Sequence, residues 1–159
     1  MFKRFIRRTP SFVFDRVWRL PTPDQEVTRL VVRIPNAMVD PEGLSGDINK
    51  YRRRQPVVIT NLENGKSVIR FVYGVGATIK GFEGITSIAL DYEAFIRLGI
   101  RKKKWRQKVQ LRMVPAWPWQ VWGYYWNHPD YGTRFQTRMT WIALIGGLLG
   151  LLFSLIPLI

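Results

Sequence analysis

The feature that most restricts how this chain can fold is an unbroken apolar stretch at residues 139–159. It contains 21 residues and no charged side chain, and the hydroxyls of Thr140 and Ser154 can bond to the backbone of their own helix. A helix of that length spans roughly 31 Å, which is close to the hydrocarbon thickness of a bilayer. The alternative is a buried core helix, but such helices rarely stay hydrophobic on every face for so long. We therefore expect a transmembrane helix over residues 139–159.

The basic residues beside this stretch predict its orientation. Arg134 and Arg138 precede it, and lysine and arginine near a span remain on the cytoplasmic side. We therefore expect a tail-anchored, single-pass protein with its N-terminus in the cytoplasm, in a bacterial inner membrane or an organelle membrane. The start, MFKRFIRRTPSFVF, has no uninterrupted apolar region and does not match a secretory signal. A mitochondrial presequence, interrupted by Pro10, is the alternative for this segment.

Composition limits the chemistry of the remaining residues, 1–138. They suffice for one domain with its own core, and they carry the whole formal net charge of +14. The chain has no cysteine, which excludes disulfides and thiolate chemistry. A single histidine, His128, is too few for an ordinary zinc site. We expect neither a metal nor a cofactor.

Shifts in composition divide the chain into four parts. In the first part, Phe2, Phe5 and Ile6 suit one face of a short helix that ends before Pro10. The four parts are a basic N-terminal lead and linker (1–26), a β-barrel-like cytoplasmic domain (27–115), an aromatic membrane-interface segment (116–138) and the transmembrane helix (139–159).

The domain is expected to be mostly β, a small barrel with up to six strands and two short helices. β-Branched runs at 27–35 and 84–91 indicate strands, and two more strands flank Asn64-Gly65, a dipeptide suited to a tight hairpin. The run QKVQLRMV alternates cleanly between apolar and polar residues. This alternation predicts three inward residues, Val109, Leu111 and Met113, and three outward residues, Lys108, Gln110 and Arg112.

Two segments indicate short helices. Leu44, Ile48 and Tyr51 stand at helical spacing, although two glycines weaken that pattern. The run YEAFIRL is the second helix, because Asp91 can cap its start and Gly99 can end it.

The unit ITSIALDYEAFIRLGIRKKKWRQKVQLRMV, read as strand, short helix, LGI and strand, resembles the half-motif of double-psi β-barrels. Such barrels occur in the N-terminal domains of AAA-type ATPases and in the cofactor-capping domains of molybdopterin oxidoreductases. The stretch GLSGDINKYRRRQPVVIT is the candidate for the other half. The family usually has a Gly-Asp turn before the last strand, where this chain has KKKWRQ. The resemblance implies a six-stranded barrel and identifies no function, because one fold hosts many.

No motif in the sequence indicates catalysis. The glycines of GVGATIKG have the wrong spacing for a dinucleotide-binding loop. Asp40, Glu42 and Asp47 could form a metal or acid–base cluster, but carboxylates near a helix start more often cap it. Asp91 is interpreted as a cap for the same reason. His128 has no serine or cysteine nucleophile nearby in the sequence, so we expect a protein that is not an enzyme.

Two basic runs predict an anionic partner. A membrane with anionic headgroups or an acidic protein fits the anchor best, because a domain at the cytoplasmic leaflet already faces negative charge. Nucleic acid is the second candidate, since Trp105 and Tyr51 could stack on bases. The candidate anion-binding residues are Lys50, Arg52, Arg53, Arg54, Arg101, Lys102, Lys103, Lys104, Arg106 and Lys108.

An aromatic belt is expected where the domain meets the span. Indole and phenol rings settle at the headgroup level of a bilayer. A protein-binding patch is the rival interpretation, and both can hold at once. The candidate interface residues are Trp117, Trp119, Trp122, Tyr124, Tyr125, Trp126 and Trp141.

Inside the span, Gly146 and Gly150 form a GxxxG pattern that lets two helices approach closely, although glycines are common in membrane helices generally. The sequence as a whole predicts a non-enzymatic interaction or assembly subunit of a membrane complex. Its expected partners are other subunits of that complex or a second copy of the chain. The alternatives are a membrane-perturbing effector that oligomerises through its span and a membrane-tethered nucleic-acid-binding protein.

Overall fold

The structure, a computed structural model, describes residues 10–20, 30–75, 79, 82, 84–100, 107–128 and 130–155. The chain forms two compact units, Met1–Ala116 and Trp117–Ile159, and each is described by itself. The helix predicted from Phe2, Phe5 and Ile6 lies outside the described residues.

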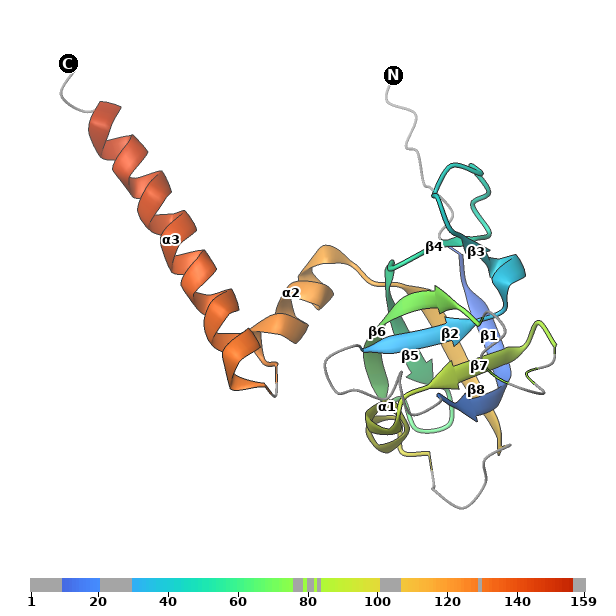
Figure 1. Cartoon of the computed structure of the whole chain (residues 1–159). Helices are drawn as coiled ribbons and strands as arrows, with labels where there is room; N and C mark the ends of the chain where they lie inside the picture. The colour runs from blue at the N-terminus through green and yellow to red at the C-terminus, as the bar shows by residue number, and fades with distance from the viewer. Residues whose placement is uncertain are drawn as a thin grey trace, which may run out of the picture. The chain divides into compact units, whose positions relative to one another are not determined.

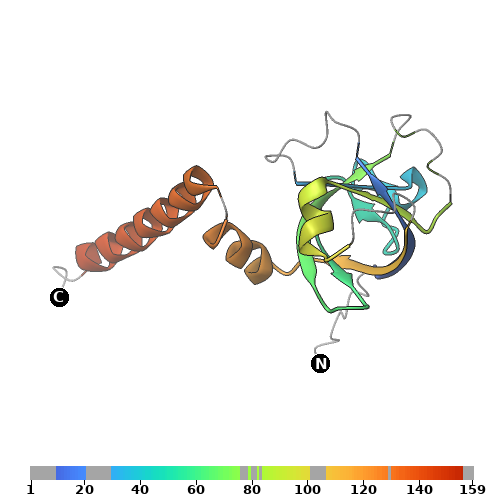
Figure 2. The ribbon, with the colours of Figure 1, turned by 90° about the horizontal axis from the view of Figure 1, so that it is seen from below.

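The first unit is a closed barrel of six strands in the order β1-β7-β2-β6-β5-β8 (Figure 1, and Figure 2 in a view turned by 90°). Along the described part of the chain, four further elements are inserted between the barrel strands. Two of them are strands that form a small parallel sheet, and the other two are short helices. The prediction of a small, mostly β barrel is therefore confirmed. The barrel strands are β1 (Phe12–Arg19), β2 (Val31–Ile34), β5 (Pro56–Asn61), β6 (Ser67–Gly74), β7 (Ser87–Leu90) and β8 (Gln107–Pro115), and the remaining elements are the 3-10 helix η2 (Asn36–Met38), β3 (Val39–Asp40), β4 (Tyr51–Arg52) and α1 (Tyr92–Arg97).

The pairing of the strands divides the barrel into two interlocked halves, β1-β2-β5 and β6-β7-β8. Strands β1 and β7 are parallel, as are β2 and β6, and the other four neighbouring pairs are antiparallel. Exchanging the two halves leaves this strand order and every pairing unchanged. Each half also carries a short helix before its last strand, η2 in the first and α1 in the second. This pseudo-twofold arrangement is the one that the double-psi resemblance predicted.

The core fills the inside of the barrel because inward and outward residues alternate along its strands. On β8 the alternation is the one predicted, with Val109, Leu111 and Met113 buried and the three residues between and beside them exposed. Tyr51 is also fully buried, and its hydroxyl donates to the carbonyl oxygen of Met113 at 2.9 Å. Burial raises the pKa of the Tyr51 phenol.

The predicted start of the domain at residue 27 was wrong. Strand β1 lies inside the segment assigned to a basic lead, and it pairs with both β7 and β8. Its alternation is interrupted at a bulge between Phe14 and Arg16, so both Phe14 and Val17 point into the core. Without β1 the barrel would not close.

The helix predicted from Leu44, Ile48 and Tyr51 was also wrong. Leu44 is 80% exposed, and Tyr51 belongs to β4 instead. Gly43 and Gly46 have positive φ angles of 71° and 65°, which a right-handed helix cannot contain. The carboxylate of Asp40 accepts hydrogen bonds from the backbone N–H groups of Gly43 and Ser45, both at 3.0 Å, and so stabilises a loop in place of a helix.

Two local predictions about turns and caps are confirmed, and one needs refinement. Asp91 caps α1 by accepting from Ala94 N–H at 2.8 Å, and Gly99 ends that helix with a φ of 70°. Strands β5 and β6 form the predicted hairpin, but of the dipeptide Asn64-Gly65 only Gly65 has a positive φ. The last pair of this hairpin is Thr60 with Ser67, so the loop is longer than a two-residue turn. The side chain of Asn64 donates to the carbonyl of Leu98 at 2.9 Å, which ties the loop to the end of α1.

The second unit consists of two helices, α2 (Pro118–Trp126) and α3 (Tyr131–Leu155). Helix α3 begins eight residues before the predicted span, because Asp130 caps it by accepting from Thr133 N–H at 2.7 Å. From Tyr131 to Ser154 it is long and apolar enough to cross a membrane. The last part of the predicted span, 156–159, lies outside the described residues.

Candidate functional site

Helix α3 carries the largest exposed apolar surface in the described part of the chain. None of its apolar window is buried, and Leu151 and Phe153 are exposed by 64% and 67%. Its charged residues, Arg134 and Arg138, are confined to the first eight positions. A long helix that is apolar on all sides and has none of its apolar window buried is typical of a membrane span.

Helix α2 presents the predicted aromatic belt on a regular helix without a charged residue. Pro118 occupies the first helical position, and the Gln120 side chain accepts from the N–H of Trp117 at 2.8 Å. The rings of Trp117 and Trp119 stack with their centroids 4.8 Å apart, and they are 56% and 62% exposed. Clustered exposed aromatic rings are typical of surfaces that interact with a membrane or a protein.

Helices α2 and α3 meet through three of the predicted belt residues. The ring of Trp122 lies 5.2 Å from that of Trp126 and, edge to face, 5.9 Å from that of Trp141 on α3. The guanidinium carbon of Arg138 lies 5.3 Å over the Trp126 ring. The structure therefore gathers Trp122, Trp126 and Trp141 into one cluster, with Arg138 over the Trp126 ring, which the sequence spacing alone did not show.

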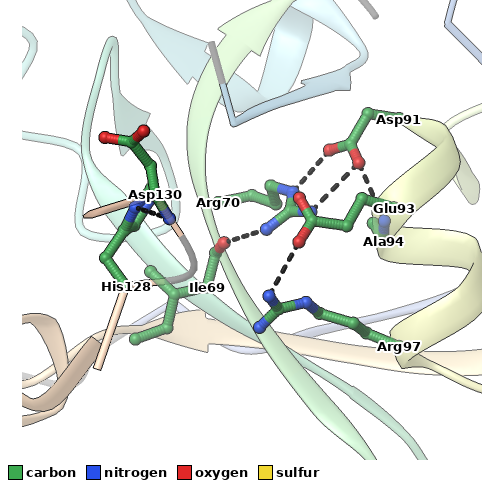
Figure 3. A network of polar contacts seen from close by, with 8 residues as sticks. All are labelled: Ile69, Arg70, Asp91, Glu93, Ala94, Arg97, His128 and Asp130. Atoms are coloured by element: carbon green, nitrogen blue, oxygen red, sulfur yellow. Dashed lines mark hydrogen bonds and ion pairs between the residues drawn. The ribbon is translucent and has the colours of Figure 1, made fainter. Parts of the chain in front are cut away.

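The remaining belt residues lie at the corner between the helices. Tyr124 and Tyr125 contact each other with ring centroids 5.5 Å apart, and both contact the ring of His128. Nδ1 of His128 accepts from the backbone N–H of Asp130 at 3.1 Å (Figure 3). Bonds from Thr133 hold the pKa of the Asp130 carboxyl below its usual range. These interactions build the turn between α2 and α3 and leave Nδ1 occupied.

A buried ion pair joins α1 to the barrel wall, and sequence reasoning missed it. Arg70 is completely buried on β6, where its Nε and Nη2 donate to the two carboxylate oxygens of Asp91 and its Nη1 donates to the carbonyl of Ile69 (Figure 3). Glu93 lies within 3.5 Å of Arg70 and pairs with Arg97 at 2.7 Å. The available signal was the position of Arg70 between Val68 and Val72 on the inward face of an alternating strand.

The described basic candidates form two separate groups. Arg52, Arg53 and Arg54 are exposed at the turn between β4 and β5, which we call the arginine turn, and Lys50 is half-buried just before it. Lys108 is exposed near the start of β8, directly opposite Arg16 of β1. The other five candidates, Arg101, Lys102, Lys103, Lys104 and Arg106, lie outside the described residues.

The backbone of the arginine turn is held firmly to the barrel. The N–H of Arg54 donates to the carbonyl of Val72 at 2.7 Å, and Val72 N–H donates to Gln55 at 3.0 Å. Arg54 has a positive φ of 64°, a conformation that favours glycine. The guanidinium carbon of Arg53 lies 5.8 Å over the ring of Tyr73.

The suggestion that Tyr51 stacks on nucleic-acid bases was wrong. Its ring is fully buried and packs 5.9 Å from that of Phe12, and its hydroxyl is used inside the core. Trp105, the other ring in that suggestion, lies outside the described residues.

The carboxylates singled out in the sequence serve the fold. The Ser45 hydroxyl donates to Asp40 at 2.8 Å and, with backbone N–H groups, lowers the pKa of that carboxyl. Glu42 and Asp47 are exposed on the same loop. Within the described ranges no three histidine or acidic side chains gather in a way that could hold a metal ion. Of the GVGATIKG glycines, Gly74 ends β6, and the other two lie outside the described residues.

Gly146 and Gly150 lie one turn apart on α3. A Cβ atom built on either residue would meet no heavy atom within 4 Å. The space beside this ridge is therefore open within the chain itself, as close approach by another helix would require.

No family model matches the chain, and no curated protein matches it. Among solved structures, it is similar to the computationally designed protein msDPBB_sym2, with a TM-score of 0.45 and 16% sequence identity. The alignment covers 67% of this chain and 99% of the designed protein, and it concerns the fold alone. By its own strand order and its two parallel pairs, the first unit of this protein is a closed six-stranded barrel of the double-psi type.

Proposed function

We propose that this protein is a membrane-anchored, non-enzymatic interaction subunit, with the barrel as its docking module on the cytoplasmic face. The observation that carries the proposal is α3, a helix of membrane-spanning length whose apolar surface is exposed along its whole described length. Covering that surface with lipid removes it from water. This removal is the dominant favourable contribution to the free energy of inserting the helix.

The cluster of Trp122, Trp126, Trp141 and Arg138 supports a particular depth for the helix. Trp141 stands three residues after Arg138, so it lies about 4.5 Å deeper along the helix axis. A guanidinium reaches the phosphate level while indoles settle just beneath it. The bilayer surface would then cross α3 between these two residues, with α2 at the same level.

The orientation follows from the two arginines at the start of α3. Arg134 and Arg138 precede the charge-free part of the helix, on the side of the barrel. Lysine and arginine beside a span are retained in the cytoplasm, so the barrel would face that compartment. The membrane is then a bacterial inner membrane or an organelle membrane.

The contacts of three carboxylates and of Arg70 support a binding role over a catalytic one. Asp91 and Arg70 satisfy each other, Asp40 organises a loop and Asp130 caps a helix. These charged groups therefore have structural partners, whereas the side chains of Arg52, Arg53, Arg54, Trp117 and Trp119 remain exposed. Surfaces of this kind are typical of docking to a membrane or a protein.

The proposal is tested by purifying the full chain from membranes in mild detergent, with a chain lacking α2 and α3 as the comparison. A protein that co-purifies in stoichiometric amounts with the full chain is the expected result. Homo-oligomers alone, together with leakage of vesicles, would favour the membrane-perturbing effector. Bound nucleic acid would favour the tethered nucleic-acid-binding protein, and a chain that fractionates without membranes would refute the proposal.

Assembly through α3 makes a separate prediction. We expect G146I/G150I to insert normally, because isoleucine is favourable in a bilayer, but to lose crosslinked oligomers or its partner, because the added side chains keep a second helix away. The matched control is G146A/G150A, which keeps a small residue at both positions and should retain assembly. Crosslinking in native membranes measures the assembly of both variants. Assembly of G146I/G150I equal to that of the wild-type chain would show that the glycine ridge is not the contact.

A further inference from the structure

The structure brings the arginine turn to the point where the chain leaves the barrel. The N–H of Ala116 donates to the carbonyl of Pro56 at 2.9 Å, and Val57 pairs with Pro115. Ala116 is the last residue of the first unit, and Trp117 begins the second. The pairing of β5 with β8 therefore places the arginine turn at the same end of the barrel as Ala116, about sixty positions later in the sequence.

The covalent distances at this end are short. Arg54 stands two residues before Pro56, so at most about 7 Å of chain separates their Cα atoms. Trp117 follows Ala116 directly, and its Cα is about 3.8 Å away. If the aromatic residues of α2 lie at the membrane interface, the arginine turn is held within reach of the headgroups.

The arginine turn has the chemistry of a phosphate-binding surface. Its three side chains are exposed, and within the described residues none of them forms an ion pair with a carboxylate. The acidic residue nearest in the sequence is Asp47, five residues before Arg52. Asp40 is paired opposite Arg52, but its carboxylate is already engaged by Ser45. Guanidinium groups bind phosphate oxygens through paired hydrogen bonds.

Arg54 adds an independent argument. Its left-handed backbone would be better served by glycine or asparagine, so the fold itself does not favour an arginine here. Residues kept in a disfavoured backbone conformation are concentrated at functional sites. The strain at Arg54 therefore supports a function for its side chain.

The second basic group lies at the other end of the barrel. Lys108 is seven residues before Pro115 on β8, a distance of about 24 Å along the strand. Arg16 is paired opposite Lys108, so it lies at that end as well. Lys66 also lies at that end, in the loop that closes the β5–β6 hairpin. A barrel that stands on the arginine turn cannot place Lys108 at the same headgroup layer.

We propose that the arginine turn binds the phosphate groups of anionic phospholipids, so that the barrel stands on the membrane with this end down. This inference rests on the proposed membrane anchor. The end with Arg16, Lys66 and Lys108 then points away from the bilayer. Near an anionic surface, three basic residues favour the docked orientation by roughly a hundredfold.

The test uses the full chain in lipid nanodiscs. Because the chain has no cysteine, a nitroxide label can be placed at a single introduced cysteine, either Q55C beside the arginine turn or S67C at the far end. A lipid whose headgroup chelates Ni²⁺ relaxes labels that come close to the surface. All discs contain the same small fraction of this chelating lipid. The remaining lipid is a mixture of phosphatidylglycerol and phosphatidylcholine in the anionic discs and phosphatidylcholine alone in the neutral discs.

We expect strong relaxation at position 55 and little at position 67 in anionic discs. The variant R52Q/R53Q/R54G should abolish relaxation at position 55, and its glycine suits the left-handed backbone, so the barrel should still fold. The charge-matched control R16Q/K66Q/K108Q should retain the relaxation at position 55. High salt should weaken this relaxation in the wild-type chain, because the Debye length falls from about 10 Å at 0.1 M to about 3 Å at 1 M.

Three outcomes would overturn the proposal. These are stronger relaxation at position 67 than at 55, the same relaxation in the arginine variant as in the wild-type chain, and equal relaxation in neutral and anionic discs. Single-stranded DNA that binds the wild-type chain in discs and not the arginine variant, with headgroup contact unchanged, would assign the turn to nucleic acid instead. Insertion is checked first by alkaline extraction, so a failure of the anchor is distinguished from a failure of the arginine turn.

Discussion

Replacing Asp91 with alanine is expected to lower the free energy of unfolding of the barrel by about 3–5 kcal/mol, because Arg70 would remain buried without a counter-charge. The guanidinium is fully buried on β6, and Asp91 binds it through both carboxylate oxygens. The same substitution removes the cap of α1, which contributes about 1 kcal/mol by itself. The free energy of unfolding is measured by denaturing the full chain in detergent with a chemical denaturant and monitoring the loss of structure by circular dichroism.

Two further variants separate the ion pair from the cap. Asp91→Asn keeps an oxygen that can accept from Ala94 N–H, so it should lose the charge and retain most of the cap. R70M/D91N removes the buried charge altogether and should recover much of the lost stability, since hydrophobic replacements of buried pairs are often tolerated. If Asp91→Ala unfolds at the same denaturant concentration as the wild type, the pair does not stabilise the barrel.

Deleting residues 139–159 is expected to move the protein from the membrane fraction to the soluble fraction, or to leave it bound so loosely that salt extracts it. The deletion removes the charge-free part of α3 and keeps Arg134, Arg138 and the aromatic helix α2. Aromatic and basic residues alone give only reversible binding at an interface. Fractionation of cells followed by alkaline carbonate washing measures the difference.

The matched control replaces residues 139–159 with a leucine helix of equal length. This chain should resist carbonate extraction as the wild type does, because insertion depends on length and hydrophobicity. It should nevertheless lose any assembly that needs Gly146 and Gly150. A deletion that stays in the membrane through carbonate washing would place the main anchor elsewhere in the chain.

Much of the architecture could be predicted from local patterns. The apolar helix, the alternation along β8 and the cap at Asp91 each depend on residues close together in the sequence, and the structure shows the alternation, the cap and the helix as far as residue 155. The barrel itself was predicted because its strands have strong β-branched runs. The start of α3 was predicted eight residues too late, because hydropathy reports where the charges stop, whereas the cap at Asp130 decides where the helix begins.

The errors came from features that tertiary contacts decide. Strand β1 looked like a basic lead because three of its eight residues are charged, and only its pairing with β7 and β8 shows that it closes the barrel. Leu44 and Ile48 stand at helical spacing, yet the bonds of Asp40 to the loop backbone oppose a helix. Helical spacing is weak evidence where glycines adopt positive φ angles.

The sequence by itself determined that this protein has an apolar stretch long enough to cross a membrane, an aromatic segment beside it and a basic domain of β structure, because hydropathy, charge and alternation are properties of neighbouring residues. Only the tertiary structure decided which distant residues meet. It paired Arg70 with Asp91, gathered Trp122, Trp126 and Trp141, and brought the arginine turn to Ala116. These contacts depend on strand order and register, which follow from how the whole barrel closes and are not encoded in any single segment.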